Sequence, residues 1–239
     1  MTLLYALAGL LMGSLLNWAA DYLPRFAASD TAIPRPSYPR PVSAVWHVLK
    51  SLSSRASLAS LPKTFWLDVT EELIAALLFA YLGERFGLSW KLFHLCVACS
   101  FFLLIALIDL RYRLVLNVLV FPAMAITLLL HSIPPGGDTI ITLLGGVFGL
   151  SPFLLAAWLK PGQLGAGDVK LAALIGLIAG FPLVVYALIA AVLTGGVTTV
   201  LLLLTHQWDL KSTIPYAPFL CFGAIISLVY APFLLTFPR

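Results

Sequence analysis

Residues 183–204 read LVVYALIAAVLTGGVTTVLLLL and contain no Asp, Glu, Lys or Arg. A run of about 20 apolar residues is long enough to cross the roughly 30 Å hydrocarbon core of a bilayer as an α-helix. The whole chain of 239 residues has the same character, with 61% hydrophobic and 10% charged residues and a mean hydropathy of +1.02. A soluble domain is about half apolar and about a quarter charged. The composition therefore excludes a cytosolic enzyme, a disordered chain and a nucleic-acid binder, and it predicts an integral membrane protein.

Seven further apolar runs accompany this one, and together they predict an all-α, polytopic membrane protein with about eight transmembrane helices. The runs cover 2–20, 69–83, 91–108, 114–130, 140–159, 169–180, 183–204 and 218–237. The sixth run is short, since its residues rise only about 18 Å as a helix, and its start is expected to lie within the membrane depth. We divide the chain into a first transmembrane helix at 1–22, a loop at 23–67 and a membrane domain at 68–239.

The distribution of basic residues predicts how the chain is oriented in the membrane. Eleven of the fourteen Lys and Arg residues fall on one side if the eight runs alternate in direction, and only Arg85, Lys91 and Arg239 fall on the other. Because basic loops face the cytoplasm, both termini are expected on the non-cytoplasmic side and the 23–67 loop in the cytoplasm. Within that loop, residues 42–61 are expected to form a helix lying on the membrane surface.

Two acidic residues lie where hydrolytic chemistry is possible. Asp109 ends the third run and Asp168 opens the sixth, so both are expected at the cytoplasmic boundary. Two close carboxylates share a proton, so that the ionised one activates water and the protonated one polarises a scissile carbonyl. Gly165 and Gly167 would permit positive φ and close approach of an extended substrate backbone. Each aspartate also has a structural alternative, since Asp168 can cap a helix and Asp109 can pair with a neighbouring arginine.

Other polar and small residues have structural interpretations. Asp68 and Glu71 are typical of a helix start, whereas Glu72, one position deeper, is not explained in this way. Cys96 and Cys99 lie inside an apolar run without a second ligand pair, so we predict no metal site. The glycines within the apolar runs predict close helix packing: Gly145, Gly146, Gly149, Gly195 and Gly196.

Five segments in order resemble the motifs of the type IV prepilin peptidases, membrane aspartyl peptidases that remove the leader from pilins and type II secretion pseudopilins. The segment 164–172, Leu-Gly-Ala-Gly-Asp-Val-Lys-Leu-Ala, resembles their GxGD-x-K-L signature. The other matches lie within 13–25, 72–87, 109–122 and 214–219. The GxGD motif alone would be weak, because presenilin-like proteases carry it too, but the ordered set is specific.

The resemblance implies that Asp109 and Asp168 are the catalytic aspartates. It implies removal of a short basic leader from a prepilin or pseudopilin at the cytoplasmic face of a bacterial cytoplasmic (inner) membrane, among membrane lipids and without a cofactor. The remaining expected site residues match motif positions, and we expect them to bind substrate or shape the site: Gly165, Gly167, Lys170, Glu72 and Asn17.

The sequence departs from the bifunctional members of this family in the first cytoplasmic loop. Those members carry two CxxC pairs that bind zinc and are linked to N-methylation, with S-adenosylmethionine as donor, whereas residues 21–67 contain no cysteine. Two alternatives stay open: a bifunctional peptidase that also methylates the new N-terminus, and a non-enzymatic membrane assembly or transport component. A transporter usually shows a repeat, and none is visible. The sequence does not indicate which prepilin is cleaved, whether it builds a pilus or a secretion system, or any oligomeric state.

Overall fold

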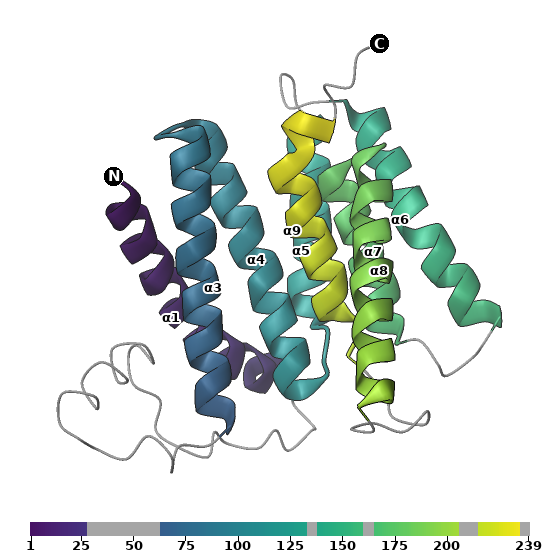
Figure 1. The fold of residues 1–239 in the computed structure, drawn as a ribbon. Coiled ribbons are helices and arrows are strands. Elements are labelled where there is room, and N and C mark those ends of the chain that lie inside the picture. The colour runs from purple at the N-terminus through teal and green to yellow at the C-terminus, as the bar shows by residue number, and fades with distance from the viewer. Residues whose placement is uncertain (28–62, 133–137, 160–164, 206–214, 235–239) are drawn as a thin grey trace. The chain divides into compact units, whose positions relative to one another are not determined.

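The computed structural model describes residues 1–27, 63–132, 138–159, 165–205 and 215–234. All regular elements in these ranges are α-helices (Figure 1). They are α1 (Thr2–Ala27), α3 (Lys63–Phe86), α4 (Trp90–Tyr112), α5 (Asn117–Ser132), α6 (Thr139–Leu159), α7 (Ala166–Ala179), α8 (Leu183–Leu204) and α9 (Ala217–Leu234). The all-α prediction is confirmed, and each apolar run overlaps one helix.

The helices have the length and composition of a membrane protein. Among the described residues, α1, α4, α6 and α8 are each long and apolar enough to cross a membrane, and α5 and α9 contain shorter apolar helices. The prediction of a polytopic membrane protein is therefore confirmed. The number of eight spans and the side on which the termini lie stay predictions. The proposed surface helix at 42–61 lies outside the described residues.

Two helix boundaries differ from the sequence expectation. The first helix continues past residue 22 to Ala27, and α3 begins at Lys63, ahead of the predicted run. The interpretation of Asp68 and Glu71 as a helix start is therefore wrong, because both lie inside α3. The helix extends toward its N-terminus because Phe65, in the added turn, is a buried packing residue.

The chain divides into two compact units, residues 1–108 and 109–239, called here the first and second units. In the first unit, α1 packs along α3 with little side-chain volume between them. A Cβ on Gly9 would lie 2.5 Å from the carbonyl oxygen of Ala75, and one on Gly13 would lie 2.7 Å from the Cα of Glu72. Glycine at these positions allows the two helix backbones to touch.

In the second unit, α7 is the central helix, because it contacts α5, α6, α8 and α9. Half of its residues are buried. With 14 residues it is only about 21 Å long, as its short apolar run predicts. Within this unit, successive helices alternate in direction along the chain (Figure 1).

Glycines also form the contact between α6 and α7. A Cβ on Gly176 would overlap the carbonyl oxygen of Gly145, and a Cβ on Gly149 would overlap that of Ala172. Gly195 is likewise close to aromatic rings, with its Cβ position 3.2 Å from Tyr216. The prediction of close packing is wrong for Gly196, because this residue lies on the exposed side of α8, and an added Cβ would have no neighbour within 4 Å among the described residues.

A matched pair of substitutions tests this packing. Gly176→Ala places a methyl group against backbone atoms that cannot rotate away, so we expect it to lower the free energy of unfolding by about 1–3 kcal/mol. Gly196→Ala adds the same methyl group where there is space, and it should raise helix stability by up to about 1 kcal/mol. Thermal unfolding in detergent micelles measures both. Equal effects of the two substitutions would contradict the packing described for α6 and α7.

Candidate active site

Asp109 lies near the C-terminal end of α4 and is only 5% exposed. The backbone N–H of Ala217, the first residue of α9, donates a hydrogen bond to its carboxylate. Its Oδ2 atom is buried and has no hydrogen-bond partner among the described residues. The chain therefore holds this carboxylate through a backbone donor and leaves its second oxygen without a protein donor among the described residues.

The turn that follows Asp109 is conformationally unusual. Arg113 has a φ of 54°, the only positive φ at a non-glycine residue in the described ranges. Its N–H donates to the carbonyl oxygen of Asp109 at 2.8 Å, which closes the last turn of α4. The positive charge of Arg113 also acts on the Asp109 carboxylate. A left-handed arginine costs about 1 kcal/mol or more, and here it directs the chain from α4 toward α5 while keeping a cation beside the carboxylate.

Asp168 is the third residue of α7, and Gly165 is the N-cap. The backbone N–H of Gly165 donates to the Asp168 carboxylate, which is one half of a capping box. Asp168 is therefore not the N-cap residue of α7, and its structural role is to accept from the N–H of the residue that is. This contact also fixes the carboxylate at the start of α7.

Neither Gly165 nor Gly167 adopts the positive φ that glycine permits. Gly165 has a φ of −68°, the extended conformation usual for an N-cap, and Gly167 lies within α7. Instead, the absence of a side chain at both positions allows neighbouring atoms to approach closely. A Cβ on Gly165 would lie 3.3 Å from Oδ2 of Asp168, and a Cβ on Gly167 would lie 2.8 Å from the Cβ of Val115. Gly165 leaves the carboxylate uncovered, and Gly167 lets the segment before α5 pack against α7.

The two carboxylates lie close enough to interact electrostatically, since the negative charge of Asp109 acts on Asp168. Both residues belong to the second unit. Residues 113–116 connect the end of α4, which carries Asp109, to α5. Helix α5 packs against α7, which carries Asp168. An arrangement of this kind can hold one proton between two carboxylates and act as both acid and base.

Tyr216 and Ala217 are site residues to which the sequence assigned no role. Burial, and after it the negative charge of Asp168, raises the pKa of Tyr216 above its ordinary value, so the phenol stays protonated at neutral pH. Ala217 supplies the backbone donor to Asp109. The signal that could have identified both is the motif at 214–219, which includes them and matches the family pattern.

Lys170 connects α7, which carries Asp168, to the start of α5. Its Nζ donates to Oδ1 of Asn117 at 3.1 Å and lies 5.1 Å from the centre of the Phe121 ring. Asn117 begins α5, directly after the segment that follows Asp109. The hydrogen bond between Lys170 and Asn117 therefore connects α5 to α7 within one helical turn of the GxGD segment.

Asn17 and Glu72 lie together in the first unit. Asn17 Nδ2 donates to the carbonyl oxygen of Asp68 at 3.1 Å and is 3.5 Å from Oε1 of Glu72, to which Ser14 Oγ also donates at 3.2 Å. Glu72 is 1% exposed. The structure thus explains the otherwise unexplained Glu72 as an acceptor that ties α3 to α1.

The Lys170 bridge gives a test of local structure. Asn117→Leu removes the acceptor, and we expect the free energy of unfolding to fall by about 1 kcal/mol. Asn117→Asp keeps an acceptor and adds a charge opposite to that of Lys170, so it should preserve stability. Chemical denaturation in mild detergent measures both variants. If Asn117→Asp destabilised the protein as much as Asn117→Leu, the bridge would not hold α5 to α7.

Comparison with known proteins places this site in a family. The family model described as type IV leader peptidase family matches residues 96–200, a range that includes both aspartates. A prepilin leader peptidase/N-methyltransferase from Bacillus subtilis is 32% identical over 169 residues, which cover 70% of this chain and 67% of that protein. The chain belongs to the type IV leader peptidase family. No solved structure matches it.

Two further relatives of the leader peptidase family carry the same name. The Pseudomonas aeruginosa protein is 28% identical over 66% of this chain, and the Stutzerimonas stutzeri protein is 26% identical over 77%. This chain covers 57% and 64% of their lengths, respectively. The match therefore spans only part of the length of each of these relatives.

Proposed function

We propose that this chain is a membrane aspartyl endopeptidase that removes the short basic leader from type IV prepilins or pseudopilins. The observation that carries the proposal is the pair of interacting carboxylates at Asp109 and Asp168, one buried at the end of α4 and one at the start of α7. Membership of the leader peptidase family supports the same activity. The alternative of a non-enzymatic assembly or transport component gives no reason for the pairing.

The reaction follows from the pair holding one proton. The ionised carboxylate takes a proton from a water molecule as the water oxygen attacks the scissile carbonyl carbon, and the other carboxyl donates its proton to the carbonyl oxygen. When the tetrahedral intermediate collapses, one of its hydroxyl groups gives its proton to the ionised carboxylate as the carbonyl re-forms. The C–N bond breaks, and the leaving nitrogen takes the proton held by the other carboxyl. The Ala217 N–H keeps Asp109 in place, and the Gly165 N–H does the same for Asp168 throughout these steps.

The remaining residues have positioning roles in this proposal. Gly165 leaves the Asp168 carboxylate open to a substrate backbone, and Gly167 lets α7 approach the segment that follows Asp109. Lys170 fixes that segment through Asn117. In the first unit, Asn17 and Glu72 hold α1 to α3.

The setting proposed for the reaction is the bacterial inner membrane. The four apolar helices of spanning length support an integral membrane protein, and the excess of basic residues on one side supports a cytoplasmic position for both aspartates. A basic leader followed by an apolar segment would then meet the carboxylates at the membrane surface.

Cleavage of a prepilin by the purified full-length chain tests the function. Mass spectrometry of the product should show loss of the leader with the parent protein. Asp109→Ala and Asp168→Ala should each lower the rate by about 10²–10⁴-fold, because each removes one partner of the acid–base pair. Cleavage that persisted in both variants, with circular dichroism showing native helix content, would exclude the aspartyl mechanism.

A second activity, N-methylation of the new N-terminus, is favoured by the names of the three relatives. It would require S-adenosylmethionine as donor, and the donor need not be held by zinc, so the cysteine-free loop does not decide the question. Adding S-adenosylmethionine to the same assay tests it. A gain of one methyl group on the cleaved product would establish the bifunctional activity, and cleavage without this gain would limit the chain to peptidase activity.

A further inference from the structure

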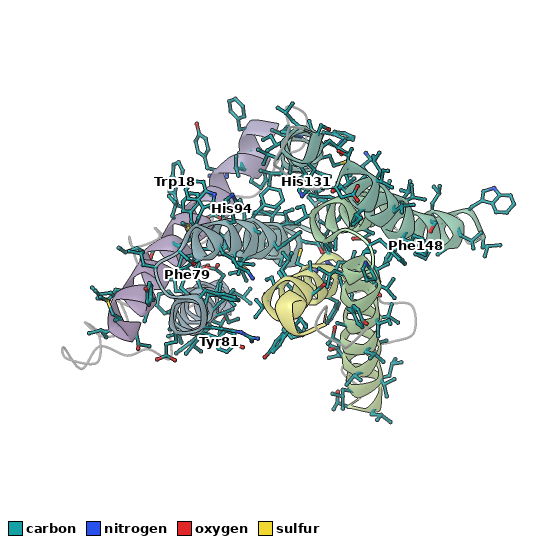
Figure 2. All side chains as sticks on the ribbon, turned by 90° about the horizontal axis from the view of Figure 1, so that it is seen from above. Trp18, Phe79, Tyr81, His94, His131 and Phe148 are labelled. Atoms are coloured by element: carbon teal, nitrogen blue, oxygen red, sulfur yellow. The ribbon has the colours of Figure 1, made fainter. Side chains whose placement is uncertain are left out.

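The second unit contains an apolar groove between α6 and α8, with a volume of about 530 Å³. Its α6 wall is formed by Phe148 and residues 151–153, and its α8 wall by side chains between Val184 and Leu193. The two helices diverge as seen in Figure 2, where Phe148 is labelled on α6. They diverge because α6 packs mainly on α7 and α8 packs mainly on α9.

The groove offers almost no polar group to an occupant. Ser151 is the one polar side chain among its lining residues, and its hydroxyl donates within α6 to the carbonyl oxygen of Phe148 at 3.5 Å. A ligand that needs hydrogen bonds or a counter-charge would therefore lose free energy on entering it. The groove is suited to an apolar segment.

One end of the groove lies next to a residue of the candidate active site. Phe153 lines the groove, and its ring centre lies 5.9 Å from that of Tyr216. Tyr216 in turn lies within the electrostatic reach of Asp168. A molecule that occupies both places would have a polar portion at the carboxylates and an apolar portion that begins at Phe153.

The dimensions of the groove suit the face of a helix. The nine residue steps from Val184 to Leu193 rise about 14 Å, which is about two and a half helical turns. Over this length an α-helix presents anchors at positions i, i+3 or i+4, and i+7 to a groove. The groove is therefore long enough for these anchors.

We propose that this groove binds the apolar helix that follows the cleavage site of the substrate. The inference rests on the proposed function and adds the surface that selects the substrate. The contact of Phe153 with Tyr216, which interacts with Asp168, favours a polypeptide over a lipid chain. A single polypeptide joins a scissile bond to an apolar helix, whereas an acyl chain has no reason to reach the carboxylates. Contacts in the groove would place the scissile peptide bond at Asp109 and Asp168.

Two positions on α8 provide a matched test. Val192 lines the groove and Val200 does not, although both are valines on one helix and each is 55% exposed. The photoreactive residue p-benzoylphenylalanine is placed at either position in the full chain carrying Asp168→Asn, which is reconstituted in phospholipid vesicles. The probe is a prepilin peptide with a basic leader, a cleavage site and the following apolar segment. Illumination should link position 192 to the apolar segment, with position 200 at background level.

A kinetic comparison separates substrate selection from folding. Val192→Trp fills the groove, so kcat/KM for the full peptide should fall about tenfold, whereas Val200→Trp should leave it unchanged. A peptide truncated before the apolar segment should be cleaved equally by both variants. Equal effects of both variants on the full peptide, equal crosslinking at both positions, or crosslinking at position 192 to lipid alone would overturn the groove assignment. Failure of the parent chain to cleave the full peptide would instead overturn the proposed function, and the groove assignment with it.

Discussion

The second unit depends on a direct backbone contact between α6 and α7. With glycine at positions 145, 149 and 176, the two helices approach until carbonyl groups of one lie against Cα atoms of the other. Because apolar side chains gain little by leaving lipid for a helix interface, close packing of this kind is a main source of stability inside a membrane. It fixes α7, a helix too short to cross the bilayer, at the centre of four neighbours. The position of Asp168 follows, since this residue begins that helix.

In the candidate site, backbone N–H groups hold both carboxylates. Asp109 accepts from the N–H of Ala217 and Asp168 accepts from the N–H of Gly165. Backbone donors at helix starts are fixed by the fold, so they hold the carboxylates in place. The protonated Tyr216 lies beside this pair and links it to the apolar groove through Phe153.

The fold class was predictable because hydrophobic runs of spanning length leave few alternatives. Asp109 and Asp168 became candidates because an acidic residue at the end of such a run is costly and because both match motif positions of the family, and their catalytic role stays a prediction. The details that sequence missed depend on tertiary contacts. The start of α3 follows from burial of Phe65, the ordinary φ of Gly165 follows from its place as an N-cap, and the open surroundings of Gly196 depend on which face of α8 is exposed. The roles of Tyr216 and Ala217 required knowledge that Ala217, at the start of α9, lies beside Asp109.

The central claim is that Asp109 and Asp168 act as one catalytic unit. A double-mutant cycle on single-turnover prepilin cleavage tests it most directly, with Asp109→Asn, Asp168→Asn and the variant that carries both substitutions. Residues that act together are strongly non-additive. The account predicts that either single substitution reduces the rate to the level of the double variant. Losses that multiply, so that the double variant is slower than each single variant by the product of their effects, would contradict a shared mechanism.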